Sequence, residues 1–243
     1  MSNIPKVIHY CWFGGNPIPA AVKKCIDSWK KYCPDYRIVE WNEKNFDYKC
    51  NQYVYEAYQS KKWAFVSDYV RLYVLKGHGG IYMDTDVEVV KKLDALLEHN
   101  AFSGFENKES IQTAIMGAVK NNSWINMLLR SYESRHFIKT DGSLDLTTNV
   151  TTITKLTKEF YSIELNNSMQ ITSDSTALYP NDYFSPKNFE TGITTITQNT
   201  YCIHHFDASW LTKGKKIKHI CTSRLKMLIG EKRVNELKAY LKK

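Results

Sequence analysis

The 243-residue sequence lacks several features that would assign it to a common class of protein. It has no internal repeat, low-complexity tract or long apolar run, so we expect one large domain and no transmembrane helix. Its six cysteines include no C-x-x-C pair, which argues against a structural zinc site. The opening MSNIPKVIHYCWFGG has no signal-peptide pattern. These absences predict a cytoplasmic protein.

Positive charge is concentrated at one end of the chain. Residues 211–243 hold 11 of the 33 Lys and Arg residues but only 2 of the 25 Asp and Glu residues, so they account for the net charge of +8. Two interpretations stay open: a helix packed on the body with a solvated basic face, or a surface helix that contacts anionic lipid at the inner face of the plasma membrane. No nucleic-acid-reading motif accompanies the charge, so we expect no nucleic-acid partner.

Hydrophobic periodicity predicts an α/β fold with a mostly parallel central sheet flanked by helices. The first half alternates strands at 6–13, 36–41 and 81–90 with helices at 19–32 and 51–75, the latter broken near 60–62. The second half is less regular, with strands expected at 101–106, 112–119 and 193–206, and helices at 123–134 (capped by Ser123), 149–160 and 223–243.

The stretch GGIYMDTDV, residues 79–87, places two carboxylates at the end of an apolar strand. Strand alternation puts Tyr82, Asp84 and Asp86 on one face. Burying bare carboxylates is costly unless they are paired or bind a metal ion. Two such oxygen ligands at the carboxyl end of a strand favour Mg²⁺ or Mn²⁺, with phosphate groups nearby.

The helix before this strand, AFVSDYVRLYVL, is apolar on almost every side. Its two charged residues, Asp68 and Arg71, are spaced i,i+3 and so share one face. They form either a structural ion pair or a polar corner that faces a ligand, and the nearby aspartates favour the second interpretation.

Residues 63–87, together with the opening IPKVIHYCWFGG, resemble the sugar-binding segment of DXD-containing glycosyltransferases. More narrowly, the chain is similar to family 32, the capsular polysaccharide and α-mannosyltransferase-like transferases, and more distantly to the glucosyltransferase domains of clostridial toxins. The resemblance covers residues 4–106, with a weaker similarity at 201–210. It implies a GT-A fold: one domain over 1–243, with a nucleotide-sugar-binding half at 1–106, an acceptor half and site loop at 107–210, and a basic C-terminal helix at 211–243.

The resemblance also implies roles for individual residues. Asp86 would bind the metal ion, Asp84 the sugar or ribose, and Asp68 and Arg71 the donor sugar. The implied nucleotide-sugar contacts are Trp12, which would stack on the base, its neighbours Phe13 and Gly14, and Tyr82. In IHHFDASW, His205 is favoured over His204 as a further metal ligand, and Ser209 and Trp210 would contact the diphosphate.

The activity implied by the resemblance is metal-dependent, retaining transfer of a sugar from a nucleotide sugar, with a UDP-sugar favoured over a GDP-sugar. The acceptor would be a glycan or a lipid-linked oligosaccharide in bacterial surface polysaccharide synthesis. Alternatives are a protein acceptor, a metal-dependent phosphohydrolase and a non-catalytic sugar-binding module; the paired aspartates argue against the last.

Overall fold

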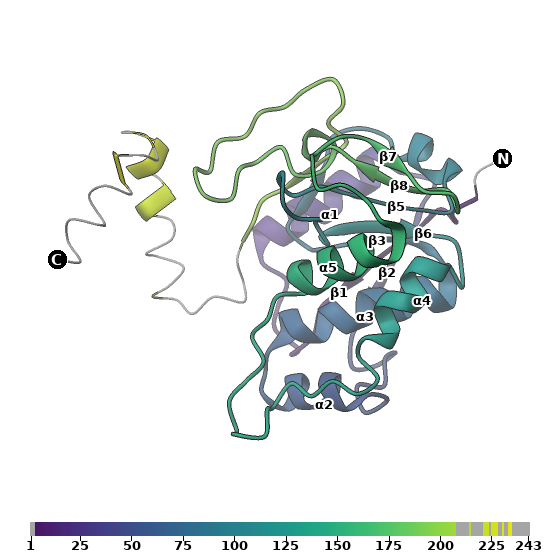
Figure 1. Ribbon diagram of the computed structural model, residues 1–243, viewed down its shortest axis with the longest axis vertical. Coiled ribbons are helices and arrows are strands. Elements are labelled where there is room, and N and C mark those ends of the chain that lie inside the picture. Colours follow the sequence, from purple (N-terminus) through teal and green to yellow (C-terminus); the bar gives the residue numbers. More distant parts are fainter. Residues whose placement is uncertain are drawn as a thin grey trace.

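The computed structural model describes residues 3–207 together with 214, 221–223, 225–227, 230 and 233–234 (Figure 1). The strands are β1 (Val7–Cys11), β2 (Arg37–Trp41), β3 (Gly80–Met83), β4 (Val87–Val89), β5 (Ala101–Gly104), β6 (Ile115–Ala118), β7 (Gln170–Ile171), β8 (Thr176–Tyr179) and β9 (Cys202–His204). The helices are α1 (Ala20–Tyr32), α2 (Gln52–Gln59), α3 (Trp63–His78), α4 (Ser123–Arg130) and α5 (Asn149–Tyr161), with short 3₁₀ helices η1 (Asp94–Glu98) and η2 (Asn181–Tyr183).

A seven-stranded sheet in the order β2-β1-β3-β6-β5-β8-β7 forms the centre of the molecule. Strand β1 pairs in parallel with β2 and β3, and β5 pairs in parallel with β8. Antiparallel β6 lies between β3 and β5, so five of the seven strands run in one direction and only β6 and β7 run in the other. This confirms the predicted α/β class, a mostly parallel central sheet flanked by helices.

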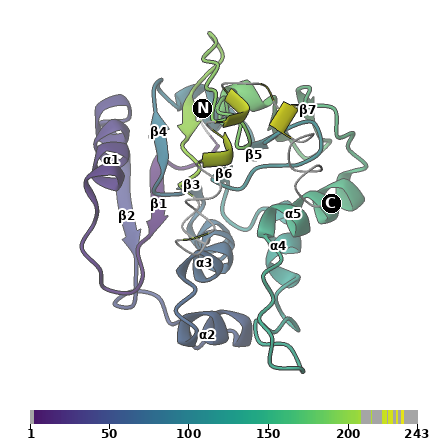
Figure 2. The same cartoon turned by 90° about the vertical axis from the view of Figure 1, so that its left-hand side faces the viewer.

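Helices cover both faces of the sheet, and each face has its own apolar core (Figure 2). Alternation along the strands divides the side chains: Ile81 and Met83 of β3 face the core under α1, whereas Tyr82 faces the core under α3, α4 and α5. Tyr82 therefore points toward the same side of the sheet as Arg71, which α3 supplies.

Several predicted elements have different bounds in the structure. The break expected near 60–62 in the helical stretch at 51–75 is confirmed, because α2 and α3 are separate helices and Lys61 between them has a φ of 54°, but α3 continues to His78. The strand expected at 81–90 is wrong as one element, because the chain turns at residues 84–86 and β4 pairs with β9 in a separate two-stranded sheet. Helix α4 is capped by Asn122, whose side chain accepts from two backbone N–H groups, and not by Ser123.

In the second half, β5, β6 and α5 confirm the predicted segments, and the strand material expected at 193–206 is reduced to β9. Strands β7 and β8 were not predicted. The helix expected at 223–243 falls largely outside the described residues. None of the described helices is both long enough and apolar enough to cross a membrane.

Candidate functional site

The two aspartates of the DTD sequence lie in a tight turn that follows β3. The backbone N–H of Asp84 donates to the carbonyl of Ala114 at 2.7 Å, and that of Val87 donates to the carbonyl of Asp84 at 3.1 Å. The turn lifts both carboxylates out of the strand at the carboxyl edge of the parallel part of the sheet. In open α/β sheets this edge is where ligands bind.

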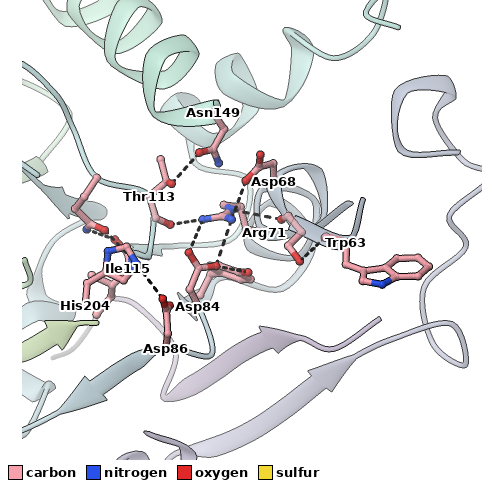
Figure 3. Close-up of polar contacts among 12 residues, drawn as sticks. Trp63, Asp68, Arg71, Asp84, Asp86, Thr113, Ile115, Asn149 and His204 are labelled. Atoms are coloured by element: carbon pink, nitrogen blue, oxygen red, sulfur yellow. Dashed lines mark hydrogen bonds and ion pairs between the residues drawn. The ribbon is translucent and has the colours of Figure 1, made fainter. Parts of the chain in front are cut away.

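Arg71 lies at the centre of a buried polar cluster beside this turn (Figure 3). Its guanidinium pairs with Asp68 Oδ1 at 2.9 Å and with Asp84 Oδ1 at 3.2 Å, and it donates to the carbonyl of Thr113. The hydroxyl of Tyr82 donates to the same Asp84 oxygen at 2.8 Å. The structure therefore brings together the helix pair and the aspartate turn that the sequence singled out separately.

Burial sets the ionisation of these carboxyl groups. It raises the pKa of Asp68 to about 7, although the charge of Arg71 acts in the opposite direction. It also raises the pKa of Asp84 against the same opposing charge. Burial disfavours ionised Asp86 as well, but the charge of His204 and the backbone N–H of Asp207 outweigh it and hold the pKa of Asp86 below its usual range. Asp86 is the carboxylate kept most firmly ionised.

Asp84, Asp86 and His204 offer three ligand atoms that lie within 4.8 Å of one another. Pairing of β9 with β4 sets His204 opposite Val87 and places its Nε2 3.5 Å from Asp86 Oδ2. Two carboxylate oxygens and one imidazole nitrogen are a donor set that suits Mn²⁺ and accommodates Mg²⁺. The side chains present thus fit the divalent ion that the sequence predicted.

The structure differs from the sequence-based choice of His205 as the histidine beside the aspartates. Neighbouring side chains at the end of β9 point in opposite directions, and the His205 ring turns away to contact Glu88 Oε2 at 2.9 Å. Only the backbone N–H of His205 reaches the turn, where it donates to the carbonyl of Asp86 at 3.0 Å. His204 takes the place that was expected for His205.

A cavity of about 480 Å³ opens over these side chains, within the range of roughly 300–1,000 Å³ that is typical of small-molecule sites. Trp12 and Phe13, which follow β1, line it, and their expected contact with a nucleotide sugar stays a prediction. The Trp12 indole N–H donates to the carbonyl of Asn16 at 2.7 Å, which holds the ring in place at the wall. Ser209 and Trp210, predicted to contact the diphosphate, lie outside the described residues.

Gly14 shapes the same cavity indirectly. It has a φ of +90°, and a Cβ on it would lie 2.7 Å from the ring of Trp63, which lines the cavity. Its backbone N–H donates to Glu43 Oε1 at 2.7 Å. Gly14 therefore allows the ring of Trp63 to pack against the backbone at residue 14. The sequence predicted instead that Gly14 lets the backbone approach the ligand.

The structure adds one site residue that sequence reasoning missed, and it places at the cavity a second residue, Glu106, that the sequence left open as a possible general base. Asn149, the first residue of α5, is buried at the cavity, where its Oδ1 accepts from the Thr113 hydroxyl at 2.9 Å. Its Nδ2 has no hydrogen-bond partner among the described residues. Glu106, which follows β5, also lines the cavity. Asn149 belongs to no motif, so no local pattern could have indicated it.

These features define a class: an α/β protein with a carboxylate–imidazole cluster and a buried Arg–Asp pair in a cavity at the carboxyl edge of its sheet. Comparison with known proteins gives the family that this part of the chain resembles. Residues 19–103 match the family described as "Glycosyltransferase sugar-binding region containing DXD motif". The matched residues, 85 of the 243, include Asp84-Thr85-Asp86, which has the spacing of a DXD motif.

The chain is also similar to individual proteins. Inositol phosphoceramide mannosyltransferase 3 of Schizosaccharomyces pombe is 31% identical over 136 residues, which are 53% of this chain and 37% of that protein. An uncharacterized glycosyltransferase of Acanthamoeba polyphaga mimivirus is 25% identical over 85% of this chain and 84% of its own length. Among solved structures, the PaToxG glycosyltransferase aligns with 65% of this chain and 70% of its own, with a TM-score of 0.48 and 21% identity.

Proposed function

We propose that the protein is a metal-dependent glycosyltransferase that moves a sugar from a nucleotide-sugar donor to a glycan or lipid-linked acceptor. The observation that carries the proposal is the gathering of Asp84, Asp86 and His204 within 4.8 Å, in one cavity with the Asp68–Arg71 pair. A glycosyltransferase needs positive charge beside the departing diphosphate, because negative charge develops there. A metal ion on the Asp84–Asp86–His204 cluster and the guanidinium of Arg71 would supply it.

In the proposed site Asp86 and His204 hold Mn²⁺ or Mg²⁺, with Asp84 at its edge. The ion, when bound, supplies positive charge to the diphosphate leaving group. Arg71 fixes Asp84 and Asp68 and adds a positive charge to the same wall. Asp68 accepts hydrogen bonds from donor-sugar hydroxyls, and Asn149 Nδ2 donates to an oxygen of the same sugar.

The finer assignments rest on resemblance. We propose a UDP-sugar donor with Trp12 against the base, transfer with retention of configuration, and a role in bacterial surface polysaccharide synthesis. The relatives named as mannosyltransferases make GDP-mannose the competing donor. A protein acceptor is the competing acceptor class.

We also propose a cytoplasmic location with peripheral contact between the basic residues 211–243 and anionic lipid. Co-sedimentation of the full chain with phosphatidylserine vesicles at low salt is the measurement, and phosphatidylcholine vesicles are the control. Absence of binding to both vesicle types contradicts the membrane contact.

A donor screen tests the central proposal. Purified protein with Mn²⁺ is given UDP- and GDP-sugars, and release of nucleoside diphosphate is measured with and without EDTA. We expect one donor to be turned over, with at least a hundredfold loss in Asp86→Asn and after chelation. Glu88→Gln is the matched control, because this carboxylate lies two residues from Asp86 but pairs with His205 outside the cavity.

The product separates the competing reactions. A glycosyltransferase or its slow hydrolytic side reaction releases a nucleoside diphosphate, whereas a phosphohydrolase cleaves the donor to a nucleoside monophosphate. If no donor binds, or if Asp86→Asn binds Mn²⁺ as the wild type does, the proposal fails.

A further inference from the structure

A second cavity, of about 490 Å³, lies beside the donor cavity. The two share Glu106 and Phe189, so they are neighbouring chambers with a common boundary. Strands β5 and β3 run in the same direction, so Glu106 after β5 and the DTD turn after β3 emerge at the same edge of the sheet. The second cavity is thus next to the place where the donor sugar would react.

An aromatic chain forms the boundary between the two cavities. The ring of His204 lies 4.0 Å, centre to centre, from that of Phe206, which lies 5.4 Å from that of Phe189. This chain leads from the candidate metal ligand to the wall of the second cavity. Glu106 is the polar group at the same boundary, and no described side chain donates a hydrogen bond to its carboxylate.

The lining of the second cavity has a distinct chemistry. Most of it consists of amide, hydroxyl and carboxylate side chains, including Asn107, Asn181, Asp182 and Thr195, with the half-buried phenyl ring of Phe189 at the boundary. Such groups exchange hydrogen bonds with a polyhydroxylated ligand, which is both donor and acceptor at each hydroxyl. Of the described residues that line it, none is Lys, Arg or His, and the charged ones are acidic.

The walls of this cavity are held by their own hydrogen bonds. Asp182 Oδ2 accepts from the Thr197 hydroxyl at 2.8 Å and from Asn199 at 3.1 Å, and Asn188 Oδ1 accepts from the backbone N–H of Thr191 at 2.8 Å. These bonds connect η2 to the segment that follows it. The polar groups of the lining are thereby fixed in position before a ligand binds, which reduces the entropic cost of binding.

We infer that the second cavity is the acceptor subsite and that it takes an uncharged saccharide ring, with Glu106 accepting a hydrogen bond from an acceptor hydroxyl at the boundary. The inference rests on the proposed glycosyltransferase function. A phosphorylated or carboxylated acceptor ring finds no basic partner among the described lining residues and meets the carboxylates of Glu106 and Asp182, whereas Glu190 is already paired with Lys226. The acceptor ring of this protein therefore differs in charge from the inositol phosphate part of the lipid for which the yeast relatives are named.

Two substitutions at neighbouring positions test the assignment. Thr195 is exposed and lines the second cavity, whereas the adjacent Thr194 is also exposed but does not line it. Thr195→Tyr fills the cavity and Thr194→Tyr is the matched control. Neither side chain is buried, and a thermal melt of each variant checks that it folds.

The acceptor panel consists of neutral p-nitrophenyl glucosides, galactosides and mannosides, with myo-inositol 1-phosphate as the anionic probe. We expect a neutral glycoside to accept the sugar, Thr195→Tyr to raise its KM at least tenfold, and Thr194→Tyr to leave it within twofold. The Kd of the donor, measured by calorimetry, is expected to stay within twofold in both variants. Glu106→Gln, which removes one negative charge, is expected to decrease the ratio of kcat/KM for neutral acceptors to kcat/KM for the anionic acceptor.

Other outcomes overturn the inference. An unchanged acceptor KM in Thr195→Tyr, transfer to the inositol phosphate alone, or donor turnover with no neutral glycoside used each contradict it while leaving the donor site intact. If the wild type binds no nucleotide sugar, the proposed function itself has failed and the acceptor subsite fails with it.

Discussion

His9, in the opening strand, should make the protein less stable at mildly acidic pH. The ring is 1% exposed, Trp41 Nε1 donates to its Nδ1 at 3.0 Å, and its Nε2 contacts the carbonyl of Gly79 at 2.9 Å. This arrangement requires the neutral tautomer with the proton on Nε2, because a second proton on Nδ1 would face the indole N–H. Burial is the main cause that lowers the pKa of His9 to about 4 from an ordinary 6.5, with the nearby charges of His78 and Arg37 adding to it.

The change in stability with pH follows from the difference between the pKa values of His9 in the folded and unfolded states. The folded state has the lower pKa, so the unfolded state binds more protons between pH 6.5 and pH 4, and stability falls as the pH decreases through that window. The stabilisation is complete above pH 6.5. Integration between pH 7.5 and pH 5 gives a loss of about 2 kcal/mol in the free energy of unfolding.

Urea denaturation of wild type and His9→Gln at pH 7.5 and pH 5 measures this loss. At pH 7.5 the substitution itself is expected to cost about 1–3 kcal/mol, because it disturbs two buried hydrogen bonds. The variant should then lose about 2 kcal/mol less than the wild type on acidification. His205→Gln, at a partly exposed ring, is the control and should follow the wild type. Parallel losses in wild type and His9→Gln would refute the reasoning.

Three further predictions concern buried charges and the donor site. Arg71→Met strands two buried carboxylates and should lower the free energy of unfolding by about 3–5 kcal/mol in urea titrations at pH 8, whereas a gain in stability would contradict its pairing role. Asn149→Ala should raise the KM of the donor about 5- to 10-fold, as loss of one hydrogen bond predicts, and should lower the free energy of unfolding by about 1–3 kcal/mol, because the buried Thr113 hydroxyl loses its acceptor. Glu56 accepts from the backbone N–H groups of Phe137 and Ile138, and although burial acts against it, these bonds lower its pKa to about 2. The wild type should therefore lose stability as the pH falls from 4.5 toward 2, and Glu56→Gln should lose less over that range.

The elements that the sequence predicted well are those whose apolar spacing is uninterrupted. Helix α1 buries Val22, Ile26 and Trp29 at helical spacing, and its observed bounds differ from the predicted ones by one residue. Strands β7 and β8 could not be found in the same way, because the first is two residues long and the second is short and fully buried. Their place in the sheet depends on the pairing of β8 with β5 and of β7 with β8, which no local pattern encodes.

The same distinction applies to the site. Asp68, Arg71, Asp84 and Asp86 could be predicted because one helix and the next turn carry all four. Strand alternation in the sequence indicates that only one of the two adjacent histidines can face the aspartates. Which one does so depends on how β9 pairs with β4, a contact across more than 100 residues that no local pattern encodes.

The contacts of Asp84 and Asp86 explain how both carboxylates are stabilised before a ligand binds. The two residues differ in these contacts. Asp84 already has Arg71 and the Tyr82 hydroxyl, both buried and both fixed to the sheet or its covering helix. Asp86 has the imidazole of His204 and one backbone N–H, from Asp207. A cation can bind both Asp86 and His204, whereas at Asp84 it competes with the buried guanidinium of Arg71 for the same carboxylate. In the proposed site Asp86 is therefore the main ligand of the ion, and Asn substitution there should weaken Mn²⁺ binding more than the same change at Asp84.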